Sequence, residues 1–221
     1  MLELINISIA GMHCDGSLLW IAAPDERLVA TYRISTGETE KKLGYLHEIW
    51  DVCPHEDGLW LVTGGGALGR QLVLWSSREG KEIRKFNCPD GAGAGMTLLD
   101  GKIWLTHPHN RKLFCLDPES GKINWVIRTE NETFSPAACK KELWLIESDP
   151  GPLGPWSESR QGRYFFSHYD PVRERIVERL PVPFIPRCMA FDGERFWYAE
   201  HGKKGLSSAA LFLSACGRGC Q

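Results

Sequence analysis

DGKIWLTHPHNRKLFCLDPESG, residues Asp100–Gly121, is the stretch that decides the fold. It begins with an Asp-Gly turn, passes through a short apolar strand that contains Trp104, and continues through a polar loop into a second apolar strand. It ends in an Asp-Pro-x-x-Gly turn. Short β-branched and aromatic runs between clusters of Asp, Gly, Pro and Ser are typical of β-hairpins. The stretch therefore predicts antiparallel strands joined by tight turns.

The same unit recurs along the whole chain, and one tryptophan marks each copy. These are Trp20, Trp60, Trp104, Trp144 and Trp197, at successive spacings of 40, 44, 40 and 53 residues. A period of about 40–45 residues that holds four short strands is typical of a β-propeller blade. No window shows the sustained i, i+3, i+4, i+7 apolar spacing of a helical solenoid. We therefore expect blades stacked around an axis.

The repeat DGKIWLTHPHNRKLFCLDPESGKINW, residues 100–125, resembles that of bacterial β-propellers of the virginiamycin-lyase-like, NHL-like and quinoprotein-like kinds. Those repeats have a DG-x-LWV strand, a loop, and a hydrophobic strand that leads into D-P-x-TG-K. The resemblance covers nearly the whole chain. Its motifs mark turns and strand cores, so it implies blades and does not specify an activity.

The sequence predicts one all-β domain over residues 1–221, a five-bladed β-propeller of four-stranded antiparallel blades. The alternating strand Glu3–Ile9 would complete the last blade and close the ring. The expected blades span about 10–46, 48–87, 89–128, 134–180 and 186–215, with strand 3–9 added to the last. In that last blade we expect strands at Pro186–Phe191, Arg195–Ala199 and Ala209–Ala215.

Two segments depart from the repeat. SDPGPLGPWSESRQG, residues 148–162, is a long insertion in the fourth blade and is either a functional lid or a tolerated insertion. The tail Leu206–Gln221 has no charged residue from Leu206 to Gly217. It is either an unusual closing strand or a truncation of a longer parent, which would weaken the count of five blades.

The composition of the chain restricts the classes of binding partner that we expect. The formal net charge is −2, with both signs interspersed, which argues against binding to nucleic acid or to an anionic membrane. We find no apolar run of about 18 residues and no basic leader, and we expect a cytoplasmic protein. Cys14, Cys53, Cys139 and Cys188 lie on or near expected innermost strands. Buried, reduced thiols are the simplest interpretation.

Candidate functional residues converge where a propeller brings its loops together, at one mouth of the central channel. The loops that join second to third strands and the crossings between blades meet there. We predict His47, Trp50, Asp51, His109, Asn110, Phe134 and Arg187 as ligand-binding residues. The candidate catalytic residues are His107, His201, Glu147 and Asp149, and the candidate metal ligands are His107, His109 and His201.

Neutral imidazoles and carboxylates from different loops could hold a divalent metal or exchange protons near neutral pH. In virginiamycin-lyase-like propellers a histidine, a metal and carboxylates at such a mouth support an elimination, so this role is implied by the resemblance. Loop histidines and acids are also ordinary surface residues. His107 and His109 would supply only half of a metal site.

Two glycine-rich stretches also lie between strands. Gly64–Arg70, GGGALGR, lacks the Lys-Ser/Thr pair of a phosphate loop and is interpreted as a wide turn. Gly91–Gly95, GAGAG, ends a crossing where missing side chains let the backbone approach the axis or a ligand.

The sequence favours a propeller that binds a small molecule or peptide at the channel mouth, without an assigned reaction. The alternatives are a metal-assisted lyase or hydrolase and a protein–protein interaction scaffold. Whether the protein is an enzyme stays open. A catalytic site predicts converging histidines, a ligand site predicts a deep mouth, and a scaffold predicts an exposed apolar patch.

Overall fold

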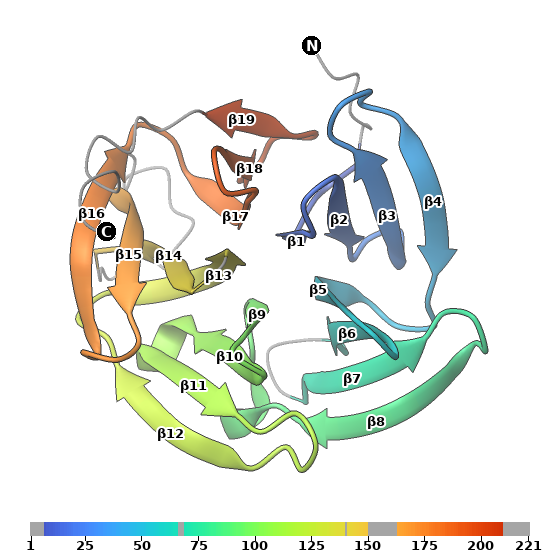
Figure 1. The fold of residues 1–221 in the computed structure, drawn as a ribbon, viewed down its shortest axis with the longest axis horizontal. Coiled ribbons are helices and arrows are strands. Elements are labelled where there is room, and N and C mark those ends of the chain that lie inside the picture. The colour runs from blue at the N-terminus through green and yellow to red at the C-terminus, as the bar shows by residue number, and fades with distance from the viewer. Residues whose placement is uncertain (1–6, 66–68, 140, 150–162, 210–221) are drawn as a thin grey trace, which may run out of the picture.

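In the computed structural model, which describes residues 7–65, 69–139, 141–149 and 163–209, five antiparallel sheets form a ring (Figure 1). Each sheet is one blade, with its first strand nearest the axis and its last strand at the rim. Blade one consists of β1 (Gly11–Cys14), β2 (Leu18–Ala23), β3 (Leu28–Arg33) and β4 (Thr39–Gly44). Blade two consists of β5 (Ile49–His55), β6 (Gly58–Thr63), β7 (Gln71–Ser76) and β8 (Lys81–Asn87).

The other three blades follow in the same order around the ring. Blade three consists of β9 (Met96–Leu99), β10 (Lys102–His107), β11 (Lys112–Leu116) and β12 (Ile123–Arg128). Blade four consists of β13 (Glu132–Cys139), β14 (Glu142–Ser148), β15 (Tyr164–Asp170) and β16 (Arg175–Val182). Blade five contains β17 (Pro186–Phe191), β18 (Phe196–Glu200) and β19 (Ser207–Ala209). The described helices are two 3₁₀ turns, η1 (Pro89–Gly91) and η2 (Pro108–Asn110), and neither is long and apolar enough to span a membrane.

The prediction of an all-β, five-bladed antiparallel propeller is confirmed. The strand expected to close the ring, Glu3–Ile9, falls mostly outside the described residues. Ile7 lies beside the last blade, because its carbonyl accepts a hydrogen bond from the Gly205 backbone N–H at 3.4 Å. The described part of the chain ends in β19 at Ser207–Ala209, so the strand predicted at Ala209–Ala215 lies, apart from Ala209, outside the described residues, as do residues 150–162.

The repeated tryptophans hold neighbouring blades together. Each occupies the second strand of its blade, and four of the five are buried. Trp60 packs against blade three, Trp104 against blade four, Trp144 against blade five and Trp197 against blade one. Trp20 packs at the remaining interface, between blades one and two. One large ring for each interface explains why the period is visible in the sequence.

The turns at either end of Asp100–Gly121 form as their residues predict. Asp100 and Gly101 join β9 to β10 with φ values of 49° and 67°, which is the conformation of a tight hairpin turn. At the other end the Asp117 carboxylate accepts the backbone N–H groups of Glu119 and Ser120 at 3.2 and 2.9 Å. The second turn also contacts blade two, because Arg84 on β8 pairs with Glu119 at 2.7 Å.

The innermost strands approach one another so closely that some positions admit only glycine. A Cβ atom on Gly11 would lie 2.5 Å from the Asp51 Cα atom, and one on Gly95 would lie 2.8 Å from the Phe134 carbonyl oxygen. Side chains bridge the other contacts. The Ser135 hydroxyl oxygen, for example, accepts the Met189 N–H at 3.3 Å. The first residues of the innermost strands are therefore held in fixed positions around the axis.

Candidate functional site

A cavity of about 130 Å³ opens at the mouth of the channel where the innermost strands begin. All five blades contribute to its wall, which places it on the axis of the ring. Its larger side chains are Trp50, Arg70, His107, His109, Phe134 and Arg187. Ala10, Pro108 and residues 92–94 complete the lining.

Three of these side chains come from irregular positions in the inner strands. The register of β5 against β6 shifts between Ile49 and Asp51, so that Trp50 is the extra residue. The pairing of β17 shifts in the same way around Arg187, and that of β13 shifts around Phe134. A β-bulge turns a side chain away from the regular alternation of a strand. Here the bulges supply Trp50, Phe134 and Arg187 to the mouth.

Trp50 and Arg70 form a stacked pair. The indole Nε1–H of Trp50 donates to the Gly64 carbonyl at 2.7 Å, which fixes the ring. The Arg70 guanidinium lies 4.2 Å from the centre of that ring, within the range of a cation–π interaction. Its Nη1 also donates to the Gly93 carbonyl oxygen. Burial lowers the pKa of Arg70, and the charge of Arg187 lowers it further.

The crossing from blade two to blade three approaches the axis, as the glycine-rich stretch Gly91–Gly95 predicts. The Gly91 carbonyl accepts the backbone N–H groups of Gly69 and Arg70 at 2.9 and 3.1 Å. A Cβ atom on Gly93 would lie 2.9 Å from a Leu105 methyl carbon. Because this backbone lies against the Arg70 loop, the Gly93 carbonyl helps to position the guanidinium.

His107 and His109 flank the buried Pro108 in η2. The His107 Nδ1 atom accepts the Asn110 N–H at 3.4 Å, so the proton of the neutral ring lies on Nε2. Burial lowers the pKa of His107, which keeps the ring neutral at neutral pH. His109 is exposed and lines the same cavity. His107 and His109 are the two imidazole side chains among the described residues of the wall.

The predicted residues His47, Asp51, Asn110 and His201 lie outside the lining of the cavity. The His47 ring contacts the Tyr45 ring, and the Asn110 side-chain amide donates to the Asp90 carboxylate at 3.3 Å. Burial lowers the pKa of His201, and the positive charge of Arg187 lowers it further. Asp51 is fully buried below the mouth. It accepts the Met96 and Val52 N–H groups at 2.7 and 2.8 Å, and burial raises its pKa well above the usual range.

The predicted acids Glu147 and Asp149 are also separate from the mouth. Glu147 lies on the same face of β14 as Leu143 and Leu145, which pack against blade three, because side chains alternate along a strand. Its buried carboxylate pairs with Arg179 at 3.0 Å and lines a second cavity. Asp149 pairs with Arg163 at 3.1 Å. The structure therefore does not bring either acid to the predicted histidines.

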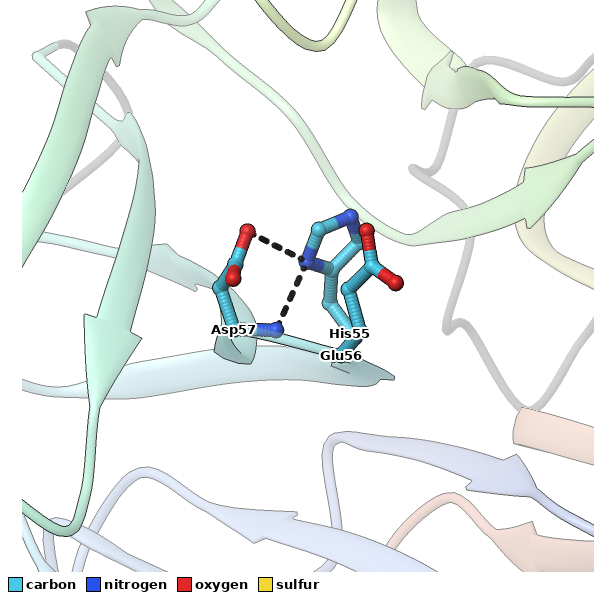
Figure 2. Close-up of side chains that lie close together, drawn as sticks. All are labelled: His55, Glu56 and Asp57. Carbon is cyan, nitrogen blue, oxygen red and sulfur yellow. Dashed lines mark hydrogen bonds and ion pairs between the residues drawn. The ribbon is translucent and has the colours of Figure 1, made fainter.

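The imidazole nitrogens of the proposed metal ligands His107, His109 and His201 do not lie close enough together to bind one metal ion. Among the described residues such a group occurs at His55, Glu56 and Asp57 in the hairpin between β5 and β6 (Figure 2). There His55 Nδ1 accepts the Asp57 N–H at 3.2 Å and lies 3.7 Å from the Asp57 carboxylate. These contacts stabilise the turn, at the opposite end of β5 from Trp50.

The channel below the mouth contains a neutral histidine–thiol pair. His13 Nδ1 lies 3.5 Å from the Cys53 sulfur. Burial lowers the pKa of His13 to about 4 and raises the pKa of the Cys53 thiol far above its usual range. A thiol acts as a nucleophile through its thiolate. The pair therefore lacks the charged form that nucleophilic catalysis needs at neutral pH.

Arg70 is the functional candidate that sequence reasoning missed. It ends the loop between β6 and β7, which corresponds to the loop of His107 and His109 in blade three. Applying the same second-to-third-strand rule to blade two would have included it. The glycines before Arg70 predict a wide turn, and this pattern does not indicate where the following side chain points.

No protein-family model and no curated protein matches this sequence. By contrast, 1218 chains of solved structures match its fold. Glutaminyl cyclase from Myxococcus xanthus matches with 11% identity and a TM-score of 0.66, over 95% of this chain and 97% of that chain. Hydrazine synthase from Kuenenia stuttgartiensis matches with 12% identity and a TM-score of 0.56, over 90% of this chain and 58% of that chain. These likenesses support the propeller fold, which does not select an activity.

Proposed function

We propose that this propeller binds a small molecule or the end of a peptide in the cavity at the channel mouth. The observation that carries the proposal is the convergence of all five blades on one cavity, with three bulged positions supplying Trp50, Phe134 and Arg187. Concave sites with aromatic walls and a few fixed polar groups are typical of ligand binding. We assign no chemical reaction to the site.

The volume of the cavity limits the size of the ligand group that it can hold. A cavity of about 130 Å³ is close to the ~150 Å³ that accommodates a benzene ring in an engineered protein core. The ligand would therefore place one small group in the cavity while the remainder lies over the rim. Pro108 fixes the backbone between His107 and His109, so this side of the rim is also preorganised.

The alternatives receive less support from the geometry. A metal-assisted lyase or hydrolase would need Glu147 or Asp149 beside the rim histidines, and both acids pair elsewhere. A protein-binding scaffold would need a continuous apolar surface. The exposed large apolar side chains of the described residues are distributed over blades one to four. The virginiamycin-lyase-like, NHL-like or quinoprotein-like character of the repeat remains a hypothesis based on its sequence pattern.

A fragment screen by ligand-observed NMR tests the proposal, with the wild-type protein at neutral pH. Trp50→Ala and His109→Ala should each weaken the binding of cavity ligands at least tenfold. The matched controls are Trp125→Ala, on the outer strand β12, and His47→Ala, and both should bind within threefold of wild type. Circular dichroism would establish that each variant is folded.

Two outcomes would overturn this function. The first is a screen without any ligand below about millimolar affinity. The second is a set of ligands whose affinity is unchanged in folded Trp50→Ala and His109→Ala proteins, because such ligands bind outside the cavity.

A further inference from the structure

We propose that the group bound in the mouth cavity is a carboxylate, held between the guanidinium groups of Arg70 and Arg187. This inference rests on the proposed function, since it names the ligand class of the same cavity. A guanidinium group presents paired N–H donors whose spacing matches the two oxygens of a carboxylate. An aromatic or aliphatic carboxylic acid would place its acid group between the arginines.

The first argument is the charge of the wall. Arg70 and Arg187 both line the cavity, and its lining by described residues contains no Asp or Glu. Glu48 and Asp25 partly offset the two positive charges, but neither reaches the lining. Two like charges in a partly buried site repel each other, and burial weakens their hydration. A bound anion would offset both the repulsion between the two arginines and their loss of hydration.

The second argument is an unsatisfied donor of the Arg70 guanidinium. Some described arginines, such as Arg33, Arg84 and Arg163, form an ion pair with a carboxylate. Within the described part of the chain Arg70 forms no such pair, and its Nε atom is buried without a hydrogen-bond partner. A buried donor of a charged group normally has an acceptor. The oxygen of a ligand would supply it.

The third argument is preorganisation. Stacking on Trp50 and the bond to the Gly93 carbonyl hold the Arg70 guanidinium, while the indole is itself anchored to Gly64. Because few rotamers remain to be fixed, binding an anion costs little side-chain entropy. Trp50 and Phe134 add apolar wall to the same cavity. This combination favours an organic acid over an inorganic anion.

Isothermal titration calorimetry with phenylacetate, its neutral analogue phenylacetamide and inorganic phosphate tests the inference. Phenylacetate should bind at least tenfold more tightly than phenylacetamide and more tightly than phosphate. Arg70→Gln and Arg187→Gln should each weaken phenylacetate at least tenfold and change phenylacetamide less than threefold. The control Arg84→Gln removes a surface arginine that pairs with Glu119 and should leave all three affinities unchanged.

Arg70→Lys provides a second test that is milder for folding. It keeps the charge but loses the paired donors, so phenylacetate should bind with an affinity between those of wild type and Arg70→Gln. Equal binding of acid and amide, or unchanged phenylacetate binding in folded Arg70→Gln protein, would overturn the carboxylate assignment. Binding of phosphate without phenylacetate would overturn it too.

The experiment separates failure of this inference from failure of the proposed function. If the amide binds as well as the acid and Trp50→Ala abolishes both, the cavity binds ligands without carboxylate selectivity. If neither compound binds and the fragment screen also finds no cavity ligand, both proposals fail together.

Discussion

Gly11 tests the close contact of the innermost strands of blades one and two, on which the mouth depends. In Gly11→Ala the new Cβ atom would lie 2.5 Å from both the Asp51 Cα atom and the Trp50 carbonyl oxygen. Carbon atoms in contact are normally about 3.5–4.0 Å apart, so the two strands must separate by roughly 1 Å. These two atoms belong to the backbone and cannot rotate away, unlike the Asp51 side chain, which is also close.

Overpacking of a well-packed core costs about 1–3 kcal/mol, and a backbone clash belongs at the upper end of that range. We therefore expect Gly11→Ala to lose about 3 kcal/mol of unfolding free energy. For a domain of this size that corresponds to a fall of about 6–12 °C in the melting temperature. Because Ala10 and Trp50 line the cavity beside this contact, ligand affinity should fall as well.

Urea unfolding and differential scanning calorimetry would measure both changes, with Gly44→Ala as the matched control. Gly44 lies on the outer strand β4, where an added Cβ atom meets nothing within 4 Å. Alanine there should be neutral or stabilising by up to about 1 kcal/mol. A Gly11→Ala protein within 1 kcal/mol of wild type would refute the close inner-strand packing described here.

The remaining predictions concern two buried ionisable groups. Since the folded-state pKa of His13 is lowered to about 4, the unfolded chain binds more protons below pH 6.5, and stability should fall by up to roughly 3 kcal/mol between pH 6.5 and 4. Urea unfolding of His13→Gln should show a smaller loss over that range, and an equal loss would contradict the assignment. Arg179→Met leaves the buried Glu147 carboxylate without its cation and should cost about 2–4 kcal/mol, measured by the same method. Adding Glu147→Gln should recover at least half of this loss, whereas no loss in the single variant would show that the ion pair contributes nothing.

Much of the fold could be predicted because its signals are local. The Asp100–Gly101 turn depends on two adjacent residues, and each repeated tryptophan marks one blade interface. Antiparallel hairpins also connect strands that are neighbours in sequence, so strand order follows from chain order.

Part of the candidate site followed from the same topology. Once five blades surround an axis, the loops after their second strands and the crossings between them must meet at one mouth, as His107, His109 and Arg187 do. Glu147 did not follow the rule because it lies inside β14, and the alternation of that strand turns it toward Arg179.

The sequence alone thus determines the number of blades, the turns and the face on which the loops gather, because each depends on residues close together in the chain. Tertiary structure decides which side chains reach the cavity. Trp50, Phe134 and Arg187 enter it through register shifts between paired strands, and a shift depends on both partners and on the neighbouring blades. The stacking of Arg70 on Trp50 likewise joins two loops that only the closed ring brings together.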